Sequence, residues 1–297
     1  MNLSCAVCSS TSPSYAMGGQ VFCKCIVCGH ETALGTARSD FLINDGAPAT
    51  LDVKPQLLDK FKLSVVLPLS LPGKSLLDFG CSSGSFLLCC KNAGFSVLGI
   101  EPSPEPRDCA IRLLGLNVAE SIYDLNFTDK QYSVITAWHS LEHVRPAELD
   151  AIVCEMASAV AKDGAVVVSV PNRRSITARL FGAKEAFFDP EYHWHQFSLT
   201  SLEYIFKKHA LSKSDLIFSW PYNFFSSIQS VLNIFFEKNY LYLVFKRKKI
   251  KPQKMKIFLN IFLAFAISPL IFLIFIYQVI KQEEQAVLTV VFKKCWQ

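Results

Sequence analysis

The sequence predicts a doubly wound α/β fold, because short apolar runs lead into glycine turns and then into helices. The run Ser75–Phe79 breaks into Gly-Cys-Ser-Ser-Gly and then into a helix that Gly94 ends. A second apolar run closes on Glu101. Residues 149–172 then read as a helix, an Asp-Gly turn and a strand. This repeated order is typical of a sheet with helices on both faces.

Composition limits the class of protein. Of 297 residues, 51% are apolar and 19% are charged, which predicts a sizeable core and excludes a disordered chain. The net charge of +5 is local, because seven Lys and Arg residues lie between Lys246 and Lys256. We therefore expect no nucleic-acid partner. The N-terminus shows no secretory signal, and eleven cysteines then favour a reducing, cytoplasmic compartment.

The first forty residues predict a zinc knuckle. Two Cys-x2-Cys pairs, separated by sixteen residues, supply four thiolates: Cys5, Cys8, Cys25 and Cys28. The gap suits a short hairpin, and Gly29 gives the second turn its freedom. Cys23 and His30 are spare donors that could compete, and unrelated buried or surface cysteines are the alternative. Four thiolates leave no open position for chemistry, so we expect a structural Zn²⁺.

The glycine turn and the acid that follows it predict a nucleotide-like ligand. Small residues at a helix N-terminus let a ligand approach the backbone, and Glu101 can accept from a ribose diol. About twenty residues separate the turn from the acid, as expected for such a site. A nicotinamide cofactor is the alternative, but it favours Gly-x-Gly-x-x-Gly, whereas the glycines here are Gly80 and Gly84.

These residues resemble the opening motif of the class I S-adenosylmethionine-dependent methyltransferases, Asp-x-Gly-x-Gly-x-Gly. The matching positions are Asp78, Gly80, Ser82 and Gly84, with Ser82 in place of the middle glycine. The resemblance implies that Glu101 binds the cofactor's ribose, that Ser121 and Ile122 lie near its adenine, and that Trp138 lies beside it. Ser133 stands where the family often has Asp.

Residues 193–198 resemble a His-x-x-x-Phe-Ser block of the ubiquinone-biosynthesis methyltransferases, and the whole resemblance covers about residues 54–220 and 286–294. It implies a seven-stranded, mostly parallel sheet. The sixth strand is expected at Ser214–Trp220 and an antiparallel last strand at Ala286–Phe292, inserted between its predecessors. The expected domains are therefore a zinc knuckle (1–40), a methyltransferase domain (41–220), a membrane-associated insertion (221–285) and the last strand (286–297).

Methyl transfer from a sulfonium is a displacement that depends mainly on alignment. A base is needed only if the acceptor is a hydroxyl or a carbon acid. The candidates are His139, Glu142, His143, His193 and His195, with His139 and His143 first and His195 next. His139 follows the fourth strand, where ligands bind in open α/β sheets, and the resemblance implies that Glu142 and His143 lie near the acceptor. His195, like His193, lies in a loop that could cover the site.

Residues Ile257–Ile280 carry no charged side chain. As one helix they would extend about 36 Å, enough for a bilayer core of about 30 Å. One crossing would place the last strand on the far side, and two crossings through Tyr222–Phe245 would bury Glu237 and Lys238. Pro269 predicts two short halves, so we expect a monotopic hairpin that dips into the membrane. A single span with a tail outside the sheet, and an internal cap or homo-oligomer interface, are the alternatives.

The expected function is methyl transfer to a small-molecule acceptor of lipid-linked, amphipathic or sugar type. We expect the enzyme to be peripheral or monotopic on the cytoplasmic face, with the basic cluster at anionic lipids. The alternative is a catalytically lapsed methyltransferase fold that serves as a membrane-bound partner in an assembly. Ser82 and Ser133 leave that alternative open, whereas Gly80, Gly84 and Glu101 oppose it.

Overall fold

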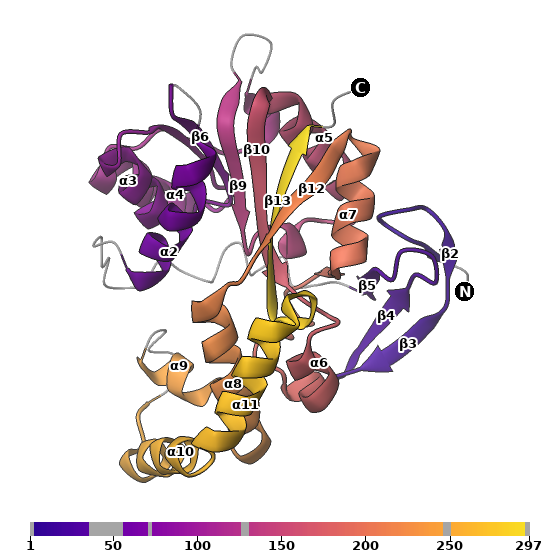
Figure 1. Ribbon diagram of the computed structural model, residues 1–297, viewed down its shortest axis with the longest axis vertical. Coiled ribbons are helices and arrows are strands. Elements are labelled where there is room, and N and C mark those ends of the chain that lie inside the picture. Colours follow the sequence, from indigo (N-terminus) through magenta and orange to yellow (C-terminus); the bar gives the residue numbers. More distant parts are fainter. Residues whose placement is uncertain (1–2, 36–55, 71–72, 126–130, 246–250, 295–297) are drawn as a thin grey trace. The chain divides into compact units, whose positions relative to one another are not determined.

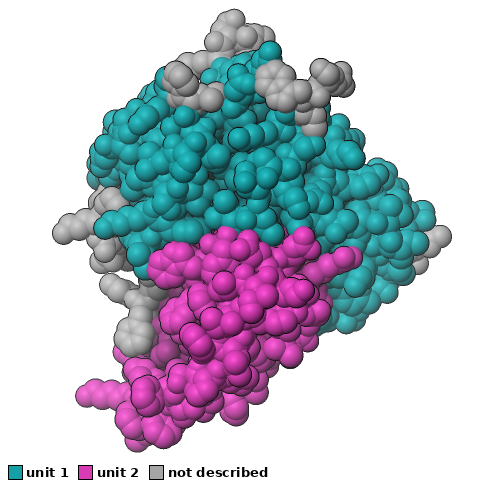
Figure 2. Space-filling view, viewed as in Figure 1, with its two compact units in different colours: residues 1–170, 190–217, 289–297 teal, residues 171–189, 218–288 magenta. Residues whose placement is uncertain are grey.

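The computed structural model describes residues 3–35, 56–70, 73–125, 131–245 and 251–294. The chain divides into two compact units, coloured separately in Figure 2. Unit 1 comprises residues 1–170, 190–217 and 289–297, and unit 2 comprises residues 171–189 and 218–288. The predicted domain boundary at residues 40 and 41, and the part of the basic cluster at residues 246–250, lie outside the described residues.

Unit 1 is built on a seven-stranded sheet. In spatial order its strands are β12 (Leu211–Ile217), β13 (Val287–Lys294), β10 (Val160–Pro171), β9 (Tyr132–Trp138), β6 (Ser75–Phe79), β7 (Ser96–Ile100) and β8 (Val118–Ala119). The pairs β10–β9, β9–β6, β6–β7 and β7–β8 are parallel, and β12–β13 is antiparallel. The predicted α/β sheet is thus confirmed, with β13 between β12 and β10.

Helices cover both faces of this sheet. Figure 1 shows α2 (Leu57–Val66), α3 (Ser85–Asn92) and α4 (Pro104–Leu114) on one side, and α5 (Leu149–Ala159) and α7 (Leu199–Lys208) on the other. Covered on both faces, the central strands are apolar and fully buried, as parallel strands are. Leu76 and Leu77 of β6 and Val134 and Ile135 of β9 have no exposed surface.

The four N-terminal zinc candidates lie in turns beside a small antiparallel sheet of unit 1. β3 (Ser14–Met17) and β4 (Gln20–Lys24) form the predicted hairpin between the cysteine pairs, and β5 (Glu31–Leu34) follows β4. The fourth strand, β11 (His195–Gln196), comes much later in the sequence, between the main-sheet strands β10 and β12, and pairs with β5. A separate two-stranded ladder joins β1 (Leu3–Ser4) to β2 (Thr11–Ser12).

Unit 2 is helical. Its helices are α6 (Ile176–Phe181), α8 (Trp220–Phe235), α9 (Tyr240–Phe245), α10 (Lys254–Ala266) and α11 (Ser268–Ile280). An apolar cluster of Val231, Ile271 and Ile274 holds α8 and α11 together. The segment 171–189, which the sequence analysis placed in the methyltransferase domain, belongs to this unit.

The structure corrects two boundaries. The sixth strand is β12, Leu211–Ile217, rather than Ser214–Trp220, because Trp220 already begins α8 with Pro221 in its first turn. The expected Asp-Gly turn at Asp163-Gly164 lies inside β10, where the register with β9 shifts between Val160 and Ala165. An irregularity in a long strand takes the place of a free turn there.

The long apolar run is broken, as Pro269 predicted. Helix α10 ends at Ala266 and α11 begins at Ser268 with Pro269 in its first turn. Within the described residues no single helix has the length and apolarity that a bilayer crossing requires. The pair α10 and α11 meets these requirements only together, with a bend of 63° between them. Tyr222–Phe245 is not one helix either, because α8 ends at Phe235.

Candidate active site and cysteine cluster

The turn after β6 is shaped by left-handed backbone. Gly80 and Gly84 have φ of 76° and 83°, and Ser82, in place of the middle glycine, has φ of 50°. Close neighbours also require the glycines. A Cβ on Gly80 would lie 2.5 Å from the Ser140 Cβ, and one on Gly84 would lie 2.6 Å from the Leu116 Cδ1. The turn therefore presents bare backbone at the carboxyl end of β6.

Glu101 is buried beside this turn. Its Oε2 accepts a 2.8 Å hydrogen bond from the Ser82 amide, and its Oε1 accepts a 2.9 Å bond from the Ser103 amide. The Arg107 guanidinium donates to the Glu101 carbonyl at 2.7 Å. The carboxylate is thus held against the turn with its remaining lone pairs available to a ligand, which fits a ribose diol.

Asp78 lies inside the sheet under the turn. The Thr136 hydroxyl donates to its Oδ1 at 2.6 Å. Burial raises the pKa of the Asp78 carboxyl to about 7, although the Lys62 charge and the Thr136 hydrogen bond lower it. Asp78 therefore supports the turn from below, and its carboxyl is only partly ionised near neutral pH.

Trp138 ends β9 and packs against Phe86 of α3, with ring centroids 5.8 Å apart in an edge-on arrangement. The Lys62 ammonium lies 5.4 Å from the Trp138 ring centroid and 5.5 Å from that of Phe86. The buried Trp138 Nε1 has no hydrogen-bond partner among the residues that the structure describes. Sequence reasoning missed Lys62, because a single lysine on the helix before the motif carries no local signal.

The two adenine candidates lie after β8. Ser121 caps a short 3-10 helix, accepting from the Tyr123 amide at 3.2 Å while its own amide donates to Asp124 at 2.9 Å. Ile122 is 2% exposed. Their role toward adenine stays a prediction.

Ser133 lies away from this edge of the sheet. It is the second residue of β9, and its hydroxyl donates to the Ser75 carbonyl at 2.7 Å. It also accepts from the Ser75 amide at 2.9 Å. In place of the Asp that the family often has here, Ser133 thus forms hydrogen bonds that join the start of β9 to the start of β6.

His139 and Glu142 follow β9 at the carboxyl edge. His139 has φ of 52°, and its amide donates to the Ser169 carbonyl at 2.8 Å. Its Nδ1 lies 3.2 Å from the Glu142 Oε1. Glu142 has no exposed surface; burial raises its pKa, but the contact with His139 and the charges of His139, His143 and His193 lower it to about 2. A buried ionised carboxylate therefore faces imidazoles.

His143 and His193 meet beside the same carboxylate. Their ring centroids are 4.8 Å apart. The Nδ1 of His143 lies 3.0 Å from the Tyr192 carbonyl, which makes Nδ1 the donor and Nε2 the basic nitrogen. Glu142, His143 and His193 each offer a ligand atom within 4.8 Å of one another, a geometry that could also hold a cation.

His195 is paired with the N-terminal module on one side and lies near Val144 and Glu142 on the other. It is 1% exposed, and its Nδ1 lies 2.9 Å from the Nε2 of the fully buried His30. Burial lowers the pKa of His195 to about 3, so it stays neutral. No sequence signal pointed to this contact across 165 residues.

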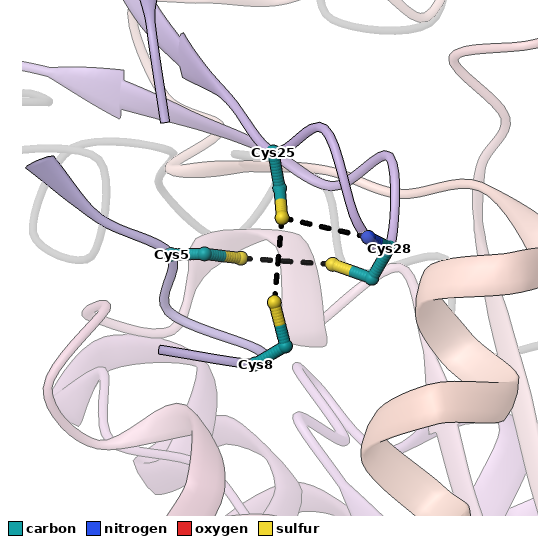
Figure 3. Close-up of side chains that lie close together, drawn as sticks. All are labelled: Cys5, Cys8, Cys25 and Cys28. Atoms are coloured by element: carbon teal, nitrogen blue, oxygen red, sulfur yellow. Dashed lines mark hydrogen bonds between the residues drawn. The ribbon is translucent and has the colours of Figure 1, made fainter. Parts of the chain in front are cut away.

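The four predicted zinc ligands converge, as Figure 3 shows. The Sγ atoms of Cys5 and Cys28 are 3.6 Å apart and those of Cys8 and Cys25 are 3.3 Å apart. A tetrahedral zinc with bonds of about 2.3 Å needs sulfurs about 3.8 Å apart, so the set fits. The amides of Val7, Val27 and Cys28 point at cysteine sulfurs at 3.4 Å, as in metal knuckles.

Comparison with known proteins identifies the family. A family model described as a methyltransferase domain matches residues 55–212, more than half of the chain. No curated protein is similar enough to count as a match.

Solved structures add weaker likenesses. A SAM-dependent methyltransferase from Archaeoglobus fulgidus is 22% identical over 54% of this chain and 70% of its own, with a TM-score of 0.44. One from Clostridium acetobutylicum is 12% identical over 82% of this chain and 94% of its own, with a TM-score of 0.47. The magnesium protoporphyrin IX methyltransferase of Synechocystis with bound SAH is 16% identical over 54% and 74%, with a TM-score of 0.44.

The assignment therefore rests on the family match, on the sheet order and on the turn that joins β6 to α3. By these criteria the chain belongs to the methyltransferase domain family and is a class I S-adenosylmethionine-dependent methyltransferase.

Proposed function

We propose that this methyltransferase modifies a lipid-linked, amphipathic or sugar-type acceptor while it lies, peripheral or monotopic, on the cytoplasmic face of a membrane. The observation that carries the membrane part of the proposal is the reversed burial of unit 2. Besides its small apolar cluster, it buries many polar side chains and exposes many large apolar ones. Soluble proteins bury apolar side chains and rarely expose them in contiguous patches.

Helix α8 has this reversed pattern. Its buried residues include six polar ones: Asn223, Ser226, Ser227, Gln229, Ser230 and Asn233. Its exposed residues include Phe224, Ile234 and Phe235, the last at 61%. A helix with this pattern is suited to an apolar solvent on its outer face.

Many of the buried polar groups of unit 2 bond to one another, although the Gln278 Nε2 and the Asn260 Oδ1 have no partner among the described residues. The Asn223 amide donates to the Gln285 Oε1 at 2.8 Å, and the Ser227 hydroxyl donates to the Gln278 Oε1 of α11 at 3.2 Å. The Asn233 amide donates to the Lys184 carbonyl at 2.9 Å. Internal satisfaction of polar groups is what a lipid environment requires, because lipid tails offer no hydrogen bonds.

Helices α10 and α11 extend this apolar surface. Exposed large side chains on them include Phe258, Ile261, Phe262, Phe265, Leu270, Phe272, Leu273 and Ile280. Each helix has 13 residues and is about 20 Å long, shorter than a bilayer core of about 30 Å. These lengths favour an element that dips into the membrane.

Basic residues flank this element. Lys254 and Lys256 lie at the start of α10, and Lys281 follows α11. Each Lys or Arg near an anionic headgroup surface contributes about 1 kcal/mol to binding. Their positions favour anionic lipids on the cytoplasmic side as the partner.

The cofactor would be held by the edge of the unit 1 sheet. Glu101 would accept hydrogen bonds from the ribose hydroxyls, and the turn formed by Gly80, Ser82 and Gly84 would face the ligand. S-adenosylmethionine supplies an electrophilic methyl group. The chain's own task is to align the acceptor with it and to exclude water.

His139 and His143 are the proposed bases for a hydroxyl or carbon acceptor. Glu142, ionised and 3.2 Å from the His139 Nδ1, would orient that ring. The His143 ring, held through Nδ1 by the Tyr192 carbonyl, has Nε2 as its basic nitrogen. For an acceptor that needs no deprotonation, these residues would serve to position it.

The cofactor part of the proposal is tested by titrating S-adenosylmethionine and S-adenosylhomocysteine into detergent-purified protein by calorimetry. We expect binding that Glu101→Ala weakens by about 1.5–3 kcal/mol, the contribution of hydrogen bonds to a charged group. Glu120→Ala is the matched control, because Glu120 only pairs with Arg107 at the surface. Folded wild-type protein that binds neither compound would refute the cofactor assignment.

A further inference from the structure

A loop of unit 1 that carries two histidines is shared by the cysteine module and by the candidate active site. We name residues 190–197 the histidine loop. Its strand β11 is the fourth strand of the module's sheet, with His195 opposite Thr32 and Gln196 opposite Glu31. The Ala33 amide also donates to the Trp194 carbonyl at 2.8 Å.

Side chains reinforce this pairing. The rings of His30 and His195 contact each other through nitrogens 2.9 Å apart, and both pack on Phe197, with centroids 5.0 Å and 5.5 Å away. His30 belongs to the second knuckle, because its carbonyl accepts from the Cys25 amide at 2.8 Å. The four-cysteine site and the histidine loop are thus joined by a buried contact.

The other side of the same loop reaches the active-site segment. The Tyr192 carbonyl fixes His143, and the buried His193 ring lies against the His143 ring beside Glu142. Only Trp194 separates His193, which faces this cluster, from His195, whose Nδ1 faces the module. A displacement of the loop therefore moves both contacts together.

We propose that zinc at the four cysteines positions the histidine loop, with His30 and His195 as the positioning residues that hold His193 and Tyr192 against Glu142 and His143. This inference rests on the proposed zinc site and methyl transfer. The module is too small for a core of its own, so zinc supplies its folding energy. Without zinc, β5 loses its support, and a two-residue strand such as β11 does not persist alone.

The test is hydrogen exchange of full-length, detergent-purified protein, read by mass spectrometry, before and after zinc is removed with a chelator. We expect peptides covering residues 190–197 to exchange about tenfold faster or more once zinc is gone. Peptides covering residues 75–92, at the cofactor turn, should keep their rates. Unchanged protection of the loop after measured zinc loss would overturn the proposal, and so would equal acceleration everywhere in unit 1.

Variants separate the contact from the metal. His30→Ala keeps all four cysteines, so the zinc content should stay the same while the loop exchanges faster and the imidazole NMR signals of His143 and His193 shift. His30→Gln restores a polar partner for His195 and should recover much of the protection. The matched control is His209→Ala, whose ring pairs with Asp150 at 3.0 Å and should leave the loop unchanged.

Cofactor titration on the same samples distinguishes failure of the proposed function from failure of the positioning role. If wild-type protein binds no S-adenosylmethionine but the loop still responds to zinc, the proposed function fails and the positioning role stands. If binding is intact and the loop ignores both zinc and His30→Ala, the positioning role fails alone.

Discussion

Ser82 occupies the left-handed position at which the family motif has glycine. Its φ of 50° costs a residue with a Cβ about 1–2 kcal/mol, yet its amide bonds Glu101 at 2.8 Å. Strain of this kind persists only where surrounding contacts over-determine the conformation. Here Gly80, Gly84 and the Glu101 carboxylate fix the turn around it, so the serine is tolerated.

We expect Ser82→Gly to stabilise the cofactor-free protein by about 1 kcal/mol, because the left-handed strain disappears and the amide bond to Glu101 stays. Ser83→Gly, next in the chain and not left-handed, should instead destabilise by about 0.5–1 kcal/mol. Urea unfolding of both variants in the same detergent measures the two effects. Changes of the same sign would show that Ser82 is not strained.

At the scale of elements, α8, α10 and α11 carry the exposed large apolar side chains of unit 2. The sequence predicted the break at Pro269, because proline acts locally on the helix. It did not reveal that α8 turns serines and asparagines inward. That arrangement depends on Gln278 and Gln285, which lie more than forty residues away and supply the hydrogen-bond partners.

A charge on the apolar face of α10 tests the membrane proposal. We expect Phe262→Glu, at a residue 61% exposed, to lower binding to vesicles of neutral and anionic phospholipid by about tenfold or more, because a charge in the apolar region costs several kcal/mol. Leu113→Glu, on α4 of unit 1 and 58% exposed, is the control and should bind as wild type does. Flotation measures both.

Two results would contradict the membrane proposal. Equal vesicle binding by the two variants would remove α10 from the membrane. Dissociation of an oligomer by Phe262→Glu, seen in light scattering with vesicle binding unchanged, would assign the face to contact between copies of the chain.

At the scale of the whole molecule, buried charge links stability to pH. The carboxyl of Asp78 has a pKa of about 7 in the folded protein and an ordinary value when unfolded. At pH values between the two pKa values, folding therefore takes up a proton at Asp78. The contribution of Asp78 to stability falls as pH rises from about 4 to about 7.

We expect the cofactor-free Asp78→Asn variant to lack this dependence, because its amide carries no charge and its Oδ1 still accepts from Thr136. Relative to wild type, its stability should rise by an amount on the order of 2–3 kcal/mol between pH 5 and pH 8. Asp163→Asn, at an exposed position, is the control. Denaturant unfolding at both pH values measures the difference; parallel behaviour of the two variants would remove Asp78 as its source.

Local patterns account for what the sequence could predict. Strand Ser75–Phe79, the glycine turn, the hairpin between the cysteines and the convergence of the four thiols follow from spacing over a few residues. The contact between His30 and His195 could not be predicted in this way, because the two residues lie 165 positions apart in the chain. The sequence singled out His139, Glu142, His143 and His193 as candidates, but it did not reveal the contact of the His193 ring with His143.

The order of the strands has a consequence for biosynthesis. β12 lies at the edge of the sheet and pairs only with β13 within the part of the sheet described, and β13 begins about 70 residues after β12 ends. At about 5–20 residues per second, the ribosome takes several seconds to supply that partner. The apolar helices α10 and α11 are made during this interval. Closure of the sheet at this edge therefore waits until the helices of unit 2 have been made.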